Sequence, residues 1–482
     1  MQILKKSIVL VLFIGFVMSS CSDDPEPSPI TLDANAGPDQ RVNIGKTVTL
    51  DGTASKGNQN STFTYLWTVV RKPLQSEAIL VSSDQARPVL SPDMPGEYEI
   101  ELTITDETGV DKDRVLVTVE HNPTVLTHIT TATVLEDVIV NSALADYWVN
   151  EDLAVDASLT IKPGVVIGFA EDAMLAVNTD GSIVALGQSS NKVTFTGKIN
   201  QKGYWRGIII YSNNSSNKML NVDILNAGSK IMLSNVSAAL TLTQDARLDI
   251  QQTKISDSKG YGINFMAGSI ITGFSMNKFD NNDEAPVLMT ANHAARMDRE
   301  SSFSNGNGRN AIEITYSALT GNGEVTWTDF SDKTPYRFLS TVSINAGLKL
   351  NPGVIIEVAP DNYVDIDGGY INAIGTTDKK IVFTGVDKTA SSWTGIILYS
   401  RSNMNVMKHV KIQYAGNKVL LSDIQTSIAL TGTASLLMEE SEISNSGGYA
   451  LTLVDEGATI NSNFKTVNTF ANNVLEPVFY NY

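Results

Sequence analysis

The stretch Leu159–Ile167, LTIKPGVVI, returns 189 residues later as Leu348–Ile356, LKLNPGVII. Two further phrases return at almost the same distance: VTFTG at 193–197 as IVFTG at 381–385, and WRGIIIYS at 205–212 as WTGIILYS at 393–400. The apolar positions are kept and the polar ones between them vary. Because the spacing barely slips, the two copies share nearly all their turns, and what is repeated is scaffold rather than a chemical motif.

The duplicated region runs from about residue 122 to residue 482 and reads as a succession of short strands. Phrases rich in Val, Ile, Leu and Thr follow one another at short intervals, separated by Gly, Asn, Asp and Ser, and no long window has the apolar period of a helix. Three such strands for each coil of about 20 to 25 residues are typical of a parallel β-helix. We therefore predict copy one at about 145–292, joining coils at about 293–335 and copy two at about 336–482.

The repeated phrases also resemble the right-handed parallel β-helix (pectin lyase-like) repeat domains of bacterial surface lipoproteins. The resemblance rests on four phrases present in both copies: Pro-Gly-Val-x-Ile at Pro163 and Pro352, Phe-Thr-Gly at Phe195 and Phe383, Trp-x-Gly-Ile at Trp205 and Trp393, and Ala-Gly at Ala227 and Ala415. It implies an all-β chain whose long β-helix is right-handed and built from two homologous copies.

Residues 32–121 predict a separate β-sandwich. The segments 47–52, 64–67 and 98–106 alternate apolar and polar side chains, as half-buried antiparallel strands do. The motifs NAGPDQ at 35–40, LDG at 50–52, YLW at 65–67, GEY at 96–98 and LTITD at 102–106 resemble a PKD domain. That resemblance implies an immunoglobulin-like spacer of cell-surface and secreted proteins. We expect Trp67 to belong to its core rather than to stack on a sugar.

The first residues predict export and lipidation. Lys5-Lys6 precede an apolar run from Ile8 to Val17, which is a secretory signal too short to span a bilayer. Small residues before Cys21 resemble a bacterial lipobox, so residues 1–20 are expected to be removed and Cys21 to be acylated. Residues 21–31, acidic and proline-rich, predict an extended tether. The resemblance implies an outer-membrane lipoprotein, exposed at the surface of a Gram-negative bacterium.

Composition restricts the partners. Cys21 is the only cysteine, which excludes an internal disulfide and a cysteine metal site. The formal net charge is −17, which argues against nucleic acid and against an anionic polymer held on a broad basic surface. Neutral glycans, cations and protein partners stay open.

A search for catalytic groups finds few. A hydrolase of the pectin lyase-like fold would need clustered aspartates, and the only Asp-Asp pair is Asp23-Asp24 in the tether. A lyase would need acidic calcium ligands beside a base. Asp361, Asp365 and Asp367 are the nearest candidates, because alternation places them on the outward face of one strand. The alternative is that these carboxylates are simply solvated.

Other polar groups give weaker signals. The acidic run at 280–284 is a second candidate for calcium, and otherwise no cofactor is predicted. The four histidines, His121, His128, His293 and His409, lack metal-ligand spacing. Both calcium candidates therefore stay secondary to a reading without a metal.

Four aromatic residues are the best candidates for ligand binding. Trp205 and Tyr211 of copy one correspond to Trp393 and Tyr399 of copy two. Exposed on one ribbon, these rings would stack on sugars; the alternative is that the tryptophans anchor each coil from inside. We predict a surface-anchored, non-catalytic binding or adhesion lipoprotein that engages a glycan or a protein. The alternatives are a divergent polysaccharide lyase or hydrolase and a purely structural surface protein.

Overall fold

The computed structural model describes residues 32–57 and 62–482. The predicted signal segment, Cys21 and the tether lie outside these residues. The chain divides into two compact units between Asn122 and Pro123, each of which is described by itself. No helix within the described residues is long and apolar enough to cross a membrane.

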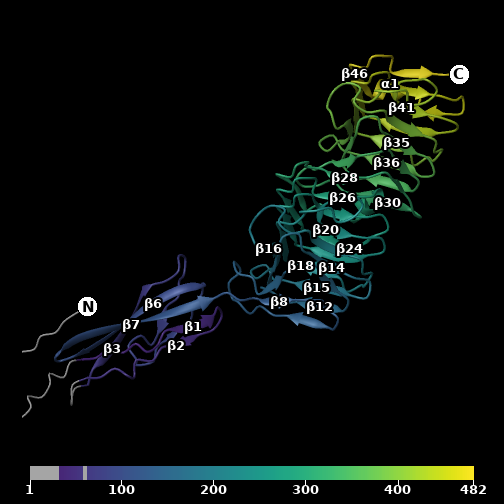
Figure 1. Ribbon diagram of the computed structural model, residues 1–482. Coiled ribbons are helices and arrows are strands. Elements are labelled where there is room, and N and C mark those ends of the chain that lie inside the picture. Colours follow the sequence, from purple (N-terminus) through teal and green to yellow (C-terminus); the bar gives the residue numbers. More distant parts are fainter. Residues whose placement is uncertain (1–31, 58–61) are drawn as a thin grey trace, which may run out of the picture. The chain divides into compact units, whose positions relative to one another are not determined.

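The N-terminal unit is a β-sandwich (Figure 1). Its four-stranded sheet contains, in spatial order, β1 (Gln40–Asn43), β7 (Gly109–Glu120), β6 (Gly96–Asp106) and β3 (Thr64–Arg71). Its three-stranded sheet contains β2 (Val48–Thr49), β5 (Val89–Leu90) and β4 (Leu80–Val81). Trp67 is buried and its indole N–H donates to the carbonyl of Gln85 at 3.0 Å, which confirms the prediction that it belongs to the core.

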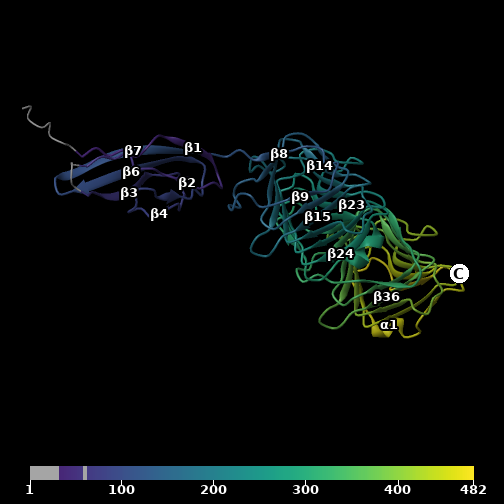
Figure 2. The same ribbon diagram turned by 90° about the horizontal axis from the view of Figure 1, so that it is seen from below.

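The C-terminal unit is a parallel β-helix, as the strand period predicted (Figures 1 and 2). One sheet of thirteen strands, here called the through sheet, extends across both copies. Its strands are β11 (Leu153–Val155), β14 (Met174–Val177), β17 (Gly207–Ile210), β20 (Ala238–Leu242), β23 (Tyr261–Phe265), β26 (Val287–Met289), β28 (Ile312–Ile314), β31 (Tyr336–Phe338), β34 (Ile355–Val358), β37 (Ile381–Gly385), β40 (Val410–Gln413), β43 (Glu442–Ser444) and β46 (Thr469–Ala471).

Two further sheets, the N-terminal sheets, belong to the first half of the β-helix. The first has eight strands: β8 (Thr124–Leu126), β10 (Tyr147–Val149), β13 (Val166–Phe169), β16 (Val193–Gly197), β19 (Val222–Leu225), β22 (Lys254–Ser256), β25 (Lys278–Asp280) and β27 (Ser302–Asn305). The second has six: β9 (Thr133–Leu135), β12 (Ser158–Ile161), β15 (Ser182–Leu186), β18 (Lys218–Leu220), β21 (Arg247–Gln251) and β24 (Ile270–Ser275).

The C-terminal sheets belong to the second half. One has seven strands: β29 (Ser317–Leu319), β32 (Val342–Ile344), β35 (Tyr363–Ile366), β38 (Gly395–Leu398), β41 (Thr426–Leu430), β44 (Tyr449–Leu453) and β47 (Val478–Tyr480). The other has six: β30 (Glu324–Trp327), β33 (Gly347–Leu350), β36 (Tyr370–Ile374), β39 (Val406–Lys408), β42 (Ser435–Glu439) and β45 (Thr459–Ile460). Helix in the described residues is confined to η1 (Ala291–Arg296) and α1 (Phe464–Val467).

Apolar side chains of neighbouring coils stack on one another inside the β-helix. Ile167 of β13 pairs in register with Phe195 of β16, and all the strands of this unit pair in parallel. Both side chains are buried in one continuous core that extends from Ile129 to Val478. The corners between strands need unusual backbone: Gly164 and Gly353, the glycines of the two Pro-Gly phrases, have φ of +91° and +95°, which L side chains rarely adopt.

Equivalent strands of the two copies lie in different sheets. β13 of copy one belongs to the eight-stranded sheet, whereas β34, its counterpart 189 residues later, belongs to the through sheet. In the same way β14 lies in the through sheet and its counterpart β35 in the seven-stranded sheet. The duplicated unit therefore spans one strand more than a whole number of coils.

The two copies meet at residues 290–335, which we call the seam. The six-stranded N-terminal sheet ends with β24 shortly before the seam, and the eight-stranded one ends with β27 inside it. The C-terminal sheets begin inside the seam at β29 and β30. Only the through sheet crosses the seam without a break. The next strand of the six-stranded sheet would lie beside β24, and the chain forms η1 in its place.

Candidate functional site

The two repeated tryptophans are core residues. Trp205 and Trp393 are fully buried. Each indole N–H donates to a backbone carbonyl one coil away, Trp205 to Leu225 and Trp393 to Gln413, both at 2.7 Å. The prediction that these rings bind a ligand is wrong, because no ligand can reach a side chain without exposed surface. The alternative, an anchor that closes each coil from inside, describes what the structure contains.

The two repeated tyrosines are partly exposed but do not share a ribbon. Tyr211 is 39% exposed and follows β17 of the through sheet, while Tyr399 is 43% exposed and follows β38 of the seven-stranded sheet. Because the duplicated unit spans an extra strand, the pair cannot form one continuous aromatic surface on a single sheet. Each tyrosine stays a candidate contact only by itself.

The three candidate calcium ligands do not lie on one strand. Only Asp365 lies within β35; Asp361 precedes it with φ of 67°, and Asp367 follows it. Asp361 accepts a hydrogen bond from Asn417 and pairs with Lys418, with both distances 2.9 Å.

Asp365 and Asp367 have a different neighbour. Asp365 accepts from Ser343 at 3.1 Å, and burial raises its pKa. Both carboxylates lie near the Tyr399 hydroxyl, whose pKa is raised by burial first and by these charges second. The structure thus brings Tyr399 and Asp365 together from separate predictions, although not as a metal site.

The second calcium candidate, at 280–284, is occupied by protein partners. Asp280 pairs with Lys278 at 3.0 Å, and Asp283 pairs with Lys202 at 2.5 Å. Within residues 32–57 and 62–482, no three His, Cys, Asp or Glu side chains are placed to hold one metal ion. The geometry therefore gives no support to either calcium prediction.

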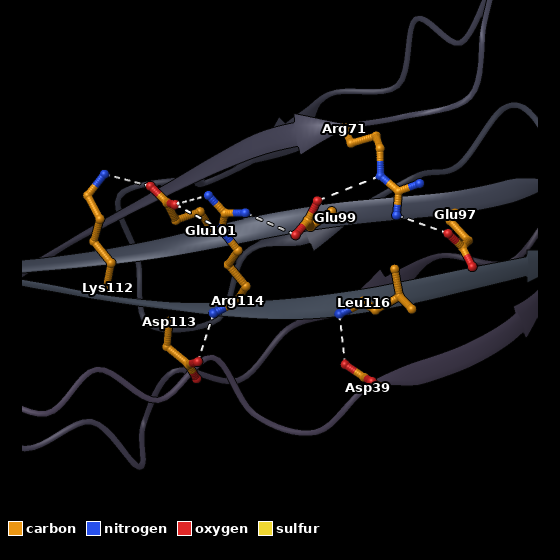
Figure 3. Close-up of polar contacts among 9 residues, drawn as sticks. All are labelled: Asp39, Arg71, Glu97, Glu99, Glu101, Lys112, Asp113, Arg114 and Leu116. Atoms are coloured by element: carbon orange, nitrogen blue, oxygen red, sulfur yellow. Dashed lines mark hydrogen bonds and ion pairs between the residues drawn. The ribbon is translucent and has the colours of Figure 1, made fainter.

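The outer face of the N-terminal sandwich carries alternating charges (Figure 3). Arg114 of β7 lies between Glu99 and Glu101 of β6, at 3.1 Å and 3.0 Å, and Lys112 pairs with Glu101 at 2.6 Å. Arg71 of β3 extends the row to Glu97 at 2.9 Å. Because the opposite charges on this face neutralise one another, it offers no broad charged surface to a partner.

A second charged row, which we call the seam ladder, crosses the seam on the through sheet. It consists of Tyr261, Arg309, Glu313, Arg337 and Glu357. The Glu313 side chain has no exposed surface; it accepts from Tyr261 at 2.8 Å and from Arg309 at 2.6 Å.

The rest of the seam ladder continues into copy two. Arg337 lies 3.9 Å from Glu313 and 2.7 Å from Glu357. Burial and the neighbouring Glu313 charge raise the pKa of Tyr261, so the phenol stays protonated. Every charged side chain in the seam ladder has an ion-pair partner, so we interpret the ladder as a structural contact between the two copies.

The seam also contains a pocket of about 520 Å³. Three consecutive layers of the coil line it: the turn into β24, the segment 290–296 around η1, and the start of β29. Its size is in the range of pockets for small molecules. We call it the seam pocket; the residues that line it are Ala267, Gly268, Ser269, Ile270, Ile271, Thr290, Asn292, His293, Arg296, Tyr316, Ser317 and Ala318.

Hydrogen bonds within the protein fix the wall of the seam pocket. His293 is buried; its Nε2 donates to the carbonyl of Ser269 at 2.9 Å, and its Nδ1 accepts from the Thr290 hydroxyl at 3.0 Å. Burial lowers the pKa of His293, so the ring is neutral at pH 7. Asn292 exchanges two hydrogen bonds with Thr320, at 2.9 Å and 3.1 Å. The wall is therefore set before any ligand arrives.

Two side chains of the seam pocket are left free for a ligand. Tyr316 is 78% exposed, and Arg296 is exposed at the end of η1. Neither side chain forms a hydrogen bond or ion pair with any residue the structure describes. None of the residues that line the pocket is Asp or Glu.

Sequence reasoning missed the seam pocket. It singled out His293 only as one of four scattered histidines and assigned residues 293–335 to joining coils. Tyr316 and Arg296 belong to no repeated phrase, so a search for shared motifs passes over them. The available signal was the reverse one, the interruption of the repeat itself, since irregular segments on a regular scaffold often carry function.

The chain thus combines an immunoglobulin-like sandwich with a parallel β-helix. Residues 36–119 match the family model described as K319L-like, PKD domain, which confirms the PKD resemblance of this unit. No match is found among curated proteins.

Among solved structures, the chain is similar to the PKD domain from the KIAA 1837 protein, with 26% identity over 20% of this chain and 93% of that one, at a TM-score of 0.18. It is also similar to a nucleoside hydrolase-related protein from Saccharophagus degradans that is associated with carbohydrate metabolism. The identity is 20% over 18% of this chain and 25% of that one, at a TM-score of 0.17. The titin M3 domain is 18% identical over 19% of this chain and 100% of that one, at a TM-score of 0.13. With TM-scores this low, we rest the assignment of the sandwich on the family model.

Proposed function

We propose that this chain is a surface-anchored, non-catalytic binding lipoprotein that captures a glycan in the seam pocket. Acylation of Cys21 would attach it to the outer membrane, and the PKD domain would serve as a spacer. The PKD match and the β-helix support a surface protein. The observation that carries binding is the seam pocket, whose wall is fixed and whose free aromatic ring, Tyr316, offers a stacking platform for a sugar.

The same pocket argues against cleavage. Hydrolysis of a glycosidic bond generally needs two carboxyl groups, and no Asp or Glu lines the pocket. His293, the only histidine among the residues that line the pocket, already uses both ring nitrogens inside the protein. A pocket that can hold a sugar but lacks these groups favours capture over catalysis.

The test is a glycan-array screen, with and without calcium, of the full chain carrying Cys21→Ser so that it is soluble. We expect binding that Tyr316→Ala abolishes and that the matched control Tyr480→Ala leaves unchanged, since Tyr480 is exposed but lies outside the pocket. Binding that survives Tyr316→Ala would place the site elsewhere. Cleavage products in mass spectrometry of the bound glycan would revive the lyase or hydrolase, and silence on the array would favour a protein partner or a structural role.

The anchor is tested separately. Mass spectrometry of the N-terminal peptide from membranes should find a diacylglyceryl group on Cys21, and Cys21→Ser should move the chain to the soluble fraction. An unmodified cysteine in the membrane fraction would contradict the anchor without touching the binding proposal.

A further inference from the structure

Arg296 differs from the three arginines nearest to it in the sequence, because it has no acidic partner among the described residues. Arg299 pairs with Asp329 at 3.4 Å, Arg309 with Glu313 at 2.6 Å, and Arg337 with Glu357 at 2.7 Å. Arg296, three residues before Arg299, instead lines the seam pocket and forms no ion pair with a described residue. In a chain with a net charge of −17, carboxylates are plentiful, so a guanidinium left free in a pocket is available to a ligand.

We infer that the seam pocket selects a sugar ring that carries a single anionic substituent, a carboxylate or a sulfate ester. Arg296 would pair with the anion and Tyr316 would stack on the ring face. A planar guanidinium matches both oxyanions through two parallel N–H donors. This inference rests on the proposed function, since it names the class of glycan that the same pocket takes.

The charges around the pocket restrict the ligand to one isolated anion. Arg296 is the only Lys or Arg among the residues that line it. The next acidic residues along the chain, Asp298 and Glu300, follow within four positions. A densely charged polymer would gain one ion pair here and meet repulsion from the rest of an acidic protein. The pocket should therefore prefer a ligand with one charge over a polyanion.

The test compares four probes in calorimetric titrations of the full chain carrying Cys21→Ser: methyl glucoside, methyl glucuronide, glucose 6-sulfate and heparin. The variant is Arg296→Gln, and the matched control is Arg401→Gln, which removes another exposed arginine without an ion pair in the described residues, far along the chain in copy two. Thermal unfolding of each variant checks that the fold is kept.

We expect one of the two singly charged probes to bind at least about tenfold more tightly than methyl glucoside. Arg296→Gln should remove that difference in affinity and change the affinity for methyl glucoside by no more than about twofold. Arg401→Gln should change neither affinity. The two anionic probes distinguish a carboxylate from a sulfate. Heparin should bind more weakly than the preferred monosaccharide.

Three results would overturn the inference. Equal affinity for neutral and charged probes would show that Arg296 does not read charge, and so would anionic binding that Arg296→Gln leaves intact. Tighter binding of heparin, with a steep salt dependence, would show a polyanion surface instead. If neutral glycans bind through Tyr316 while the charged probes gain nothing, the proposed function stands and only this inference fails. If no probe and no arrayed glycan binds, both fall.

Discussion

In copy one the indole of Trp205 donates to Leu225, and in copy two the indole of Trp393 donates to Gln413, at the same 2.7 Å. On the outside of the same coils the copies differ. Copy one has Trp148 covered by Lys198 at 4.3 Å, whereas copy two has Arg337, the counterpart of Trp148, paired with Glu357. Duplication kept the interior and the corners, and the outer surface diverged. Specific function should therefore be sought where the copies differ or where they are joined.

The largest expected effect comes from the kept interior. Trp205→Ala and Trp393→Ala should each lower the free energy of unfolding by about 3 to 5 kcal/mol through the cavity they leave. Trp205 should cost about 1 kcal/mol more, because it stacks on Phe169 with ring centroids 4.1 Å apart, where copy two has Val358. Urea unfolding gives the loss, and hydrogen exchange in β17 and β38 locates it. A greater loss for Trp393 would contradict this account of the interior.

The seam ladder comes next. Glu313→Ala should cost about 3 kcal/mol, because Glu313 is the buried acceptor of both Tyr261 and Arg309, and its loss leaves the Tyr261 hydroxyl without an acceptor and Arg309 with Glu284 alone. The control is Glu442→Ala, which breaks the more exposed pair with Lys411 at 3.4 Å in a regular coil and should cost less than about 1 kcal/mol. Urea unfolding of both variants checks the ratio. Similar losses would mean that the seam is held no differently from the rest.

The corners should respond equally in both copies. Asn217 accepts from the Ile183 N–H at 2.9 Å, and Asn405 accepts from the Ile371 N–H at 3.1 Å; each amide also donates to a backbone carbonyl. We expect Asn217→Ala and Asn405→Ala each to lower the stability by about 2 kcal/mol. Guanidinium unfolding of the two variants measures these losses. A difference of more than about 1 kcal/mol between them would show that the two corners are not equivalent.

His293 in the seam pocket should make the folded chain less stable in acid. Burial lowers the pKa of His293 in the folded chain below the ordinary value of 6.5, so the unfolded chain takes up a proton first. Stability is therefore fully present above pH 6.5 and falls as the pH drops below it, by less than the loss at the corners. Melting temperatures between pH 7.5 and pH 5 should show this slope, and His293→Asn should reduce it.

The smallest effect belongs to the charged face of the sandwich. Arg114→Gln should leave the stability almost unchanged, because the Arg114 side chain that pairs with Glu99 and Glu101 is 53% exposed to water. The effect should shrink further in high salt. A clear drop in the melting temperature at either salt concentration would show that this row is more than a solvated surface.

The sequence predicts what repeats and misses what does not. The repeated phrases predicted the strands, the parallel β-helix and, as one alternative, the anchoring role of Trp205 and Trp393. Register between distant strands leaves no such trace, so the position of Tyr211 and Tyr399 on different sheets could not be foreseen. Alternation alone also placed Asp361 on a strand that begins only at Tyr363. The seam pocket depends on three layers stacked across separate segments, which no local pattern records.

The extra strand in the duplicated unit limits how the two copies can act together. Surfaces that were identical just after duplication pointed from different sheets, as Tyr211 and Tyr399 still do. Two matching sites so placed could not both contact one flat array of ligands, so duplication would not by itself provide avidity for such an array. What it gave the β-helix was length, since each added coil extends that unit by about 4.8 Å.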